Sequence, residues 1–232
     1  MRRARPNQGR LARFLRRLLW AALAAVLCFY ASVTLSLAAL RWINPPFTAV
    51  HAQRRVEALF GRNRYQKRYS PVPMSRIAPE LQHAVVAAED SRFFQHNGFD
   101  WIEIEKALDE EEDRGYLRGA STITQQLVKN LFFTTQRSAI RKGLEITITP
   151  LMELVLAKRR ILELYLNVIE WGPGVFGAEA AAQYHYSVPA SRLTREQAAR
   201  LAALLPSPLR RKPARMDRSS AAIQERMRKM GW

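Results

Sequence analysis

The sequence predicts a mainly helical protein with one membrane-spanning helix near its N-terminus. The first observation is an apolar run without any charge over residues 18–40. The second is that apolar residues in later segments recur at helical spacing, as at Leu81, Ala84, Val85 and Ala88. The third is that no series of alternating strands with Asn-Gly or Asp-Gly turns follows. The 232 residues suit one domain of ordinary size with an appendage.

Residues 18–40 are the predicted membrane anchor. As a helix this run spans roughly 34 Å, enough to cross a bilayer core, and Trp20 and Trp42 lie near its ends. A cleaved signal peptide is the competing interpretation, but its apolar region is normally about 7–15 residues long. A buried globular helix rarely lacks charge over such a length. We therefore expect a single uncleaved anchor in the cytoplasmic (inner) membrane.

Residues 1–17 form a basic tail with seven arginines and no acid. Positive charge beside a span stays on the cytoplasmic side. We expect the N-terminus to be cytoplasmic, and the residues after Arg41 to lie on the other side of the membrane.

The net charge of +17 first indicates a polyanionic partner, which can be nucleic acid, an anionic membrane or a phosphate-bearing substrate. Residues 1–17 carry +7 and residues 207–232 carry +6, so only +4 remains in between. Such a balanced central domain argues against nucleic acid as the partner. The single cysteine, Cys28, excludes an intramolecular disulfide framework and a cysteine-based zinc cluster.

The remaining chain divides into three parts. Residues 41–78 are polar and basic after Pro45-Pro46, which predicts a juxtamembrane linker or collar near lipid headgroups. Residues 79–208 form the main domain. Residues 209–232 are a basic C-terminal tail with no assigned role.

Capping signals mark the starts of three helices in the main domain. Asp100 with Glu103 begins a helix that is expected to turn Ile104, Ala107 and Leu108 inward. Ser121 is expected to cap a helix that ends near Phe133. Thr194 with Gln197 opens a helix that is expected to stop at Pro206.

Residues 138–149 fit two patterns. Leu144, Ile146 and Ile148 alternate with polar residues, as in a strand. We expect a helix over residues 138–148, with a break or kink near Pro150.

The stretch EDSRFFQHNG at residues 89–98 is the first candidate site. Glu89 follows Ala88 at the edge of an apolar stripe, so partial burial would raise its pKa toward the range of a general base. Asp90 points about 100° away from Glu89, and His96 could orient one of the acids. A solvated helix end is the simpler alternative.

The stretch GASTITQQLVKN at residues 119–130 is the second candidate site. Thr122, Gln126 and Lys129 fall in one polar stripe of a helix. A helix N-terminus with hydroxyl groups and a lysine on one face suits an anion. An ordinary amphipathic surface helix gives the same pattern.

Arg137, Arg141, Lys142 and Glu145 are the third candidate group. An arginine-rich turn with one acid suits a diphosphate, with a divalent ion on the acid as an option. An Arg141–Glu145 ion pair on a helix surface is the alternative. Residues 158–167 are mainly core, and Gly172, Gly174 and Gly177 form either a ligand loop or a sharp turn.

Taken together and in this order, the stretches resemble the family 51 glycosyltransferases that polymerise peptidoglycan. EDSRFFQHNGFD and GASTITQQLVKN are long and specific, whereas RKGLE, KRRILELYLN and GPGVFGAEAAAQYHY are weaker singly. The matching part runs from about Leu81 to Pro208. The chain resembles the monofunctional, membrane-anchored form, since no second domain follows these motifs. Residues 184–188 depart from the family pattern, which leaves the role of that loop open.

The resemblance implies a mainly α, lysozyme-like fold with a small lobe near the membrane. It implies a lipid-linked disaccharide-peptide precursor (lipid II) and a growing glycan chain as substrates, with inversion to a β-1,4 bond. Other cell-wall synthesis or division proteins are implied as partners, and nucleic acid is not.

The resemblance also implies roles for individual residues. Glu89 is the general base that takes the proton of the acceptor 4-hydroxyl, and Glu145 is the second acid, acting directly or through Mg²⁺ or Mn²⁺. Lys129 and Arg137 would neutralise the diphosphate, and Arg141 is a further candidate substrate-binding residue. The side chains expected to shape the cleft are Asp90, Phe93, His96, Thr122 and Gln126.

Two other functions stay open on sequence alone. A lysozyme-like enzyme that cleaves glycan also uses one glutamate at a helix end. A non-catalytic basic scaffold of the cell-wall machinery, or a nucleic-acid binder, would explain the charged ends but not the motifs.

Overall fold

The computed structural model describes residues 8–61, 66–114, 119, 121–136 and 138–232. The described chain is mainly helical, as the sequence predicts. Its long helices are α1 (Gln8–Ala39), α2 (Ala49–Phe60), α3 (Pro79–Glu89), α4 (Trp101–Arg114), α5 (Ile123–Phe132), α6 (Ala139–Val155), α7 (Lys158–Val168), α8 (Ala178–Tyr186), α9 (Arg195–Ala202) and α10 (Asp217–Lys229). Four single-turn 3₁₀ helices join them: η1 (Met74–Arg76), η2 (Phe93–Gln95), η3 (Ala190–Arg192) and η4 (Pro213–Arg215).

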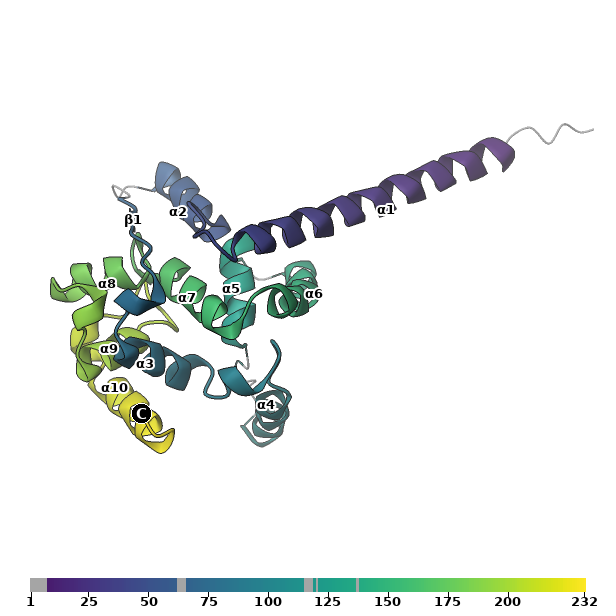
Figure 1. The fold of residues 1–232 in the computed structure, drawn as a ribbon. Coiled ribbons are helices and arrows are strands. Elements are labelled where there is room, and N and C mark those ends of the chain that lie inside the picture. Colours follow the sequence, from purple (N-terminus) through teal and green to yellow (C-terminus); the bar gives the residue numbers. More distant parts are fainter. Residues whose placement is uncertain (1–7, 62–65, 115–118, 120, 137) are drawn as a thin grey trace, which may run out of the picture.

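Helix α1 projects from the rest of the protein as a long rod (Figure 1). Within Ala12–Ala39, an 18-residue window has a mean hydropathy of 2.1 and is 6% buried, so the length and composition of this part suit a membrane span. The helix already begins at Gln8, and it therefore includes part of the basic segment that precedes the predicted span. Residues 1–7 lie outside the described residues.

The C-terminal end of α1 is docked on the domain. Leu37 is fully buried, and Tyr30 shares a 2.6 Å hydrogen bond with Thr147 of α6. From α7, Arg160 donates to the carbonyl oxygens of Leu40 and Ile43 at 2.8 and 2.7 Å. A cation at the carbonyl end of a helix is favourable for the helix dipole. Anchor and domain thus form one packed unit.

The described residues of the predicted linker or collar, 41–61 and 66–78, form a small lobe that contains α2, η1 and the short strand β1 (Arg68–Tyr69). Thr48 caps α2 by accepting a hydrogen bond from the His51 amide. Three short strands, β1 (Arg68–Tyr69), β2 (Glu170–Gly172) and β3 (Val175–Phe176), make a sheet in the order β1-β3-β2. Strand β1 is parallel to β3, and β2 is antiparallel to it. These strands were not predicted, since two or three residues are too few to show an alternation of apolar and polar side chains.

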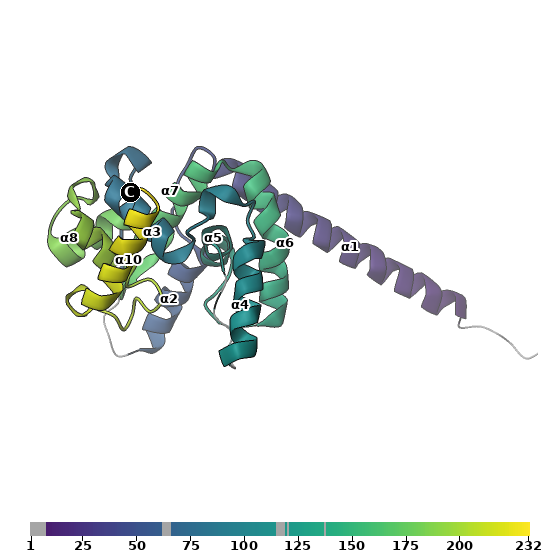
Figure 2. The same cartoon turned by 90° about the horizontal axis from the view of Figure 1, so that it is seen from below.

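The main domain is built around α3, α5 and α7. Helix α5 packs against α6 and α7, while α3 packs against α9 and α10. Among the largest fully buried side chains are Trp171, Tyr165, Phe93, Leu81, Ile123 and Leu127. Figures 1 and 2 show α1 and α6 at one end of this domain and α10 at the other. The candidate site lies between these two ends of the domain.

The C-terminal residues are part of this domain, so the prediction of a separate basic tail over residues 209–232 is wrong. Helix α10 buries Ile223 and Met227 against the core. The last residue, Trp232, stacks on His83 with ring centroids 4.4 Å apart, and its carbonyl oxygen accepts from Arg195 at 2.6 Å. The sequence of α10 contains few apolar residues and therefore did not indicate this packing.

Three details of the predicted helices change. Thr122, not Ser121, caps α5, through a capping box with Gln125. Helix α9 has the predicted Thr194 and Gln197 capping box but ends at Ala202, before Pro206. Leu108 of α4 is 55% exposed instead of inward, although Ala107 is buried and Asp100 accepts from the Glu103 amide as predicted.

Pro150 does not break its helix, so of the predicted break or kink the break is wrong. Helix α6 runs from Ala139 to Val155 with Pro150 inside it. The proline ring removes the donor that would bond the Ile146 carbonyl. One residue earlier, the Thr149 hydroxyl adds a hydrogen bond to the Glu145 carbonyl at 2.7 Å. The segment after Glu145 is thus helical, and the strand interpretation of residues 144–149 is wrong.

Asn167 joins the small lobe to α7. Its amide nitrogen donates to the Val72 and Glu163 carbonyls at 2.9 and 2.8 Å, and its oxygen accepts from the Val72 amide at 2.9 Å. The side chain is fully buried. Beside it, Gly177 has a φ of 85°, and a Cβ there would meet the Asn167 carbonyl oxygen at 2.5 Å. Gly177 is therefore required by this close approach, and Gly174, with a φ of 72°, suits the turn between β2 and β3.

We expect Asn167→Ala to lower the free energy of unfolding by about 2–4 kcal/mol, because it leaves buried backbone groups of Val72 without partners. Thermal unfolding followed by circular dichroism in detergent measures the change. Asn97→Ala, at an exposed position, is the control. Equal melting temperatures for the two variants would contradict this role of Asn167.

Candidate active site

Two adjoining hollows cross the domain between α3, α5, α6 and α10. The larger is a cleft of about 780 Å³ that contains Glu89, and the smaller, of about 610 Å³, contains Glu145. Ser121, Gln126 and Lys129 line both. The two glutamates, 56 positions apart in sequence, therefore open onto one continuous surface.

Glu89 is the last residue of α3, and α5 holds it in place. Its Oε2 accepts a hydrogen bond from Gln126 Nε2 at 2.8 Å. The Gln126 oxygen in turn accepts from the Tyr165 hydroxyl at 2.8 Å, and Tyr165 is almost fully buried. This chain fixes the amide orientation, since its oxygen faces a donor and its nitrogen faces a carboxylate.

Burial raises the pKa of Glu89 above its ordinary value. The Gln126 hydrogen bond and the charges of Lys129 and Arg211 act in the opposite direction but do not cancel the effect. A carboxylate with a raised pKa is a stronger base once ionised, as general-base catalysis requires. The alternative of a solvated helix end is therefore wrong for Glu89.

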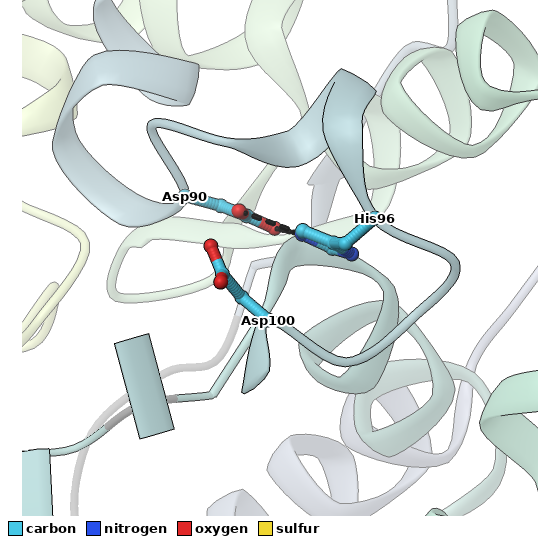
Figure 3. A group of neighbouring side chains, drawn as sticks. All are labelled: Asp90, His96 and Asp100. Carbon is cyan, nitrogen blue, oxygen red and sulfur yellow. Dashed lines mark hydrogen bonds and ion pairs between the residues drawn. The ribbon is translucent and has the colours of Figure 1, made fainter. Parts of the chain in front are cut away.

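Asp90, His96 and Asp100 form a compact cluster beside the cleft (Figure 3). His96 Nδ1 accepts from the Gly98 amide, so Nε2 carries the hydrogen and donates to Asp90 at 2.9 Å. Asp100 pairs with Arg92 at 3.2 Å. Their ligand atoms lie within 4.8 Å of one another. With its proton on Nε2, however, His96 is a hydrogen-bond donor to Asp90 and offers no lone pair to a metal.

The other oxygen of Asp90 caps α5. Oδ2 accepts from the Ile123 amide at 3.0 Å. The N-terminus of α5 thus already binds a carboxylate of the chain itself, and an external anion beside it stays a prediction. Thr122 is buried and donates to the Gly98 carbonyl at 2.7 Å. Asp90 and Thr122 together lock the 89–98 loop onto α5.

Phe93 is a correction to the expected cleft residues. It is fully buried, and Lys158 Nζ lies 4.4 Å from its ring centroid. It supports the loop from behind and cannot touch a substrate in the cleft. The His96 side chain is 6% exposed and likewise acts through Asp90.

The Glu145 hollow is lined by cations. Arg141 Nη1 and Lys142 Nζ bind separate oxygens of Glu145 at 3.0 and 2.6 Å. The predicted i, i+4 pair is therefore present, but it is not on an open helix surface, since Glu145 is only 3% exposed. Arg137 lies outside the described residues.

Lys129 connects the two hollows. Burial lowers the pKa of its ammonium group, and the nearby carboxylates of Glu145 and Glu89 partly oppose that effect. An ammonium in such a partly dry position interacts strongly with an anion. The arrangement can hold a base beside one end of a substrate and neutralise charge that develops at the other end.

Comparison with known proteins shows the family of this chain. Residues 55–230 match the family model described as Transglycosylase. The chain belongs to the transglycosylase family. The matched residues include all the side chains of both hollows and also α10. The C-terminal helix is thus part of the transglycosylase domain.

Similar proteins carry the name biosynthetic peptidoglycan transglycosylase. One from Pseudomonas entomophila is 50% identical over 186 residues, which are 80% of this chain and 79% of the relative. One from Laribacter hongkongensis is 46% identical over 192 residues, covering 81% and 84%. One from Ectopseudomonas mendocina is 44% identical over 223 residues, covering 94% and 89%.

Sequence reasoning missed several residues of the transglycosylase cleft. Tyr165, which orients Gln126, was taken only as core because it lies on an apolar helix face. Leu205, Pro206 and Arg226 line the cleft from the C-terminal part. No local pattern marks them, since they reach the site only through the packing of α9 and α10 on α3.

Proposed function

We propose that this chain is an inverting peptidoglycan glycosyltransferase that polymerises glycan strands from a lipid-linked disaccharide-peptide precursor. The observation that carries the proposal is the half-buried Glu89, held by Gln126, beside a hollow lined with Lys129, Arg141 and Lys142. The names of the similar proteins support the same activity.

In the proposed reaction Glu89 takes the proton from the 4-hydroxyl of the acceptor sugar. The freed oxygen attacks the anomeric carbon of the growing chain from the face opposite its diphosphate. The bond from that carbon to the diphosphate oxygen breaks, and the leaving group departs with its electron pair. Inversion converts the α-linked diphosphate into a β-1,4 glycosidic bond.

The leaving diphosphate gains negative charge and therefore needs cations in place before the bond breaks. Lys129 lies at the junction of the hollows, and Arg141 and Lys142 line the smaller one. Glu145 holds Arg141 and Lys142 in position through its two ion pairs. In this proposal Glu145 acts by orienting these cations toward the diphosphate.

A resident divalent cation does not fit the residues around Glu145. Both its oxygens are already paired with cations, at 2.6 and 3.0 Å, and no second acid lines that hollow among the described residues. We therefore derive no step through a metal. We expect glycan polymerisation to persist when EDTA replaces Mg²⁺ and Mn²⁺ in the assay. Loss of activity in EDTA that is restored by Mg²⁺ would contradict this and return the metal to Glu145.

We further propose that the domain lies against the membrane, with the N-terminus cytoplasmic. Several large apolar side chains near the end of α1 and on α2 are more than half exposed: Trp42, Ile43, Phe47, Val56, Leu59 and Phe60. A lipid surface would cover them. This placement keeps the diphosphate hollow on α6 close to the bilayer that holds the lipid tail. Other cell-wall proteins are proposed partners.

The test is a polymerisation assay on the full chain in detergent. The purified protein is incubated with fluorescent lipid-linked precursor, and products are separated on a gel. A ladder of glycan chains is the expected result. Absence of polymer would overturn the proposal, and release of soluble muropeptides from isolated cell wall would favour a lysozyme-like hydrolase instead.

The pH dependence of the rate follows from the two shifted groups. Glu89 must be ionised, so activity falls as pH drops through its pKa, which lies above the ordinary 4.5. Lys129 must be charged, so activity also falls as pH rises through its pKa, which lies below the ordinary 10.5. We expect a bell-shaped pH profile of kcat/KM. Its two limbs should lie closer together than the ordinary pKa values of 4.5 and 10.5 would place them. A flat profile between pH 4.5 and 10.5 would contradict both assignments.

A further inference from the structure

Helix α10 brings one arginine into the cleft that contains Glu89. Ile223 and Met227 are buried against α3 and α9. Arg226, which lies between them in the sequence, lines the cleft. Arg226 Nη1 donates to the carbonyl oxygen of Ala87 at 3.3 Å. Ala87 lies on α3 two residues before Glu89, so the position of the guanidinium is tied to that of the base.

The charge of Arg226 is not neutralised by an acid of the described chain. The one hydrogen bond that its side chain makes among the described residues is to a backbone carbonyl. By contrast, the neighbouring Arg228 on the same helix pairs with Glu225. A guanidinium has five donors, so most of those of Arg226 remain for a ligand. Arg211 adds positive potential on this side, since its charge lowers the pKa of Glu89.

The position of α10 indicates which part of the substrate this cation meets. In both views α10 lies at the end of the domain opposite α1, while α6 lies beside α1 (Figures 1 and 2). The diphosphate cations Arg141 and Lys142 are on α6, at the anchored end. Diphosphates stay near the bilayer because their lipid tails do. An anion that reaches Arg226 must therefore belong to the part of the precursor that extends away from the membrane.

We propose that Arg226 binds a carboxylate of the peptide carried by the disaccharide unit. The sugars themselves offer hydroxyl and amide groups, whereas the peptide carries carboxylates. A carboxylate suits the paired donors of a guanidinium. This inference rests on the proposed polymerase function, and it makes Arg226 a substrate-binding residue at the end of the cleft distant from the membrane.

The test compares wild type with Arg226→Gln on two precursors, one with free peptide carboxylates and one with those carboxylates amidated. With the free acid, Arg226→Gln is expected to raise KM about 10-fold or more, since a hydrogen bond to a charged group is lost. With the amidated precursor, wild type should already have the higher KM, and Arg226→Gln should change it little. Arg226→Lys should retain part of the preference for the acid.

The matched control is Arg228→Gln, which removes an equal charge from the same helix outside the cleft. An equal rise of KM on both precursors would overturn the inference and assign Arg226 to the diphosphate or to folding. If Arg226→Gln does not fold, the wild-type preference for the free acid decides, and its absence overturns the inference. Absence of polymer from wild type itself would instead overturn the proposed function.

Discussion

Glu89→Gln should reduce glycan polymerisation about 10²–10⁴-fold, the usual contribution of a general base. The amide cannot take the proton of the acceptor hydroxyl. It has the same shape, and its oxygen can still accept the 2.8 Å hydrogen bond from Gln126. The protein should therefore fold and bind precursor while losing the chemical step. Initial rates of polymer formation, measured together with precursor binding, separate these two effects.

The control for this change is Glu80→Gln, at the other end of the same helix and away from both hollows. It should retain the wild-type rate. A rate for Glu89→Gln above one tenth of wild type would remove Glu89 from the role of base. In that case the raised pKa of Glu89 would reflect burial without function.

Lys129→Gln should lower kcat roughly 10²-fold, because the diphosphate loses a preorganised cation in a poorly solvated position. A second effect is specific to this geometry. The charge of Lys129 lowers the pKa of Glu89, so its removal should raise that pKa further. The acid limb of the rate profile should then move to higher pH. Steady-state kinetics across pH measure both effects in one experiment.

Lys106→Gln is the matched control, since Lys106 is exposed on α4 and pairs only with Glu103 among the described residues. It should change neither kcat nor the acid limb. A lower kcat for Lys129→Gln with an unmoved acid limb would separate the diphosphate role from the coupling to Glu89. Unchanged kcat would contradict the diphosphate role itself.

Helices that are marked by a pattern within their own residues could be predicted from the sequence. The uncharged run gave α1, and the Thr194 and Gln197 capping box gave the start of α9. The break predicted at Pro150 is absent. Proline favours a break locally, but packing on α1 and α5 keeps α6 helical. Strand β1 was missed since its partner is distant in sequence, with Arg68 paired to Val175, whereas β2 and β3 were missed because they are only two or three residues long.

The site shows the same limit. Glu89, Gln126 and Lys129 were named from motifs, and each motif alone also fitted an ordinary helix. What decides between these interpretations is a set of long-range contacts, such as Gln126 to Glu89 and Tyr165 to Gln126. The Arg226 contact with Ala87 spans 139 positions and had no local signal at all.

The docking of α1 gives the membrane a mechanical part in the reaction. The uncharged residues 18–40 make roughly 34 Å of helix, close to the apolar thickness of a typical bilayer. Helices that span a membrane are commonly tilted from the bilayer normal. Since Tyr30 and Arg160 fasten the end of α1 to α6 and α7, any tilt carries the whole cleft with it. In the membrane placement proposed above, the bilayer would thus set the height and angle at which the cleft meets a lipid-borne substrate.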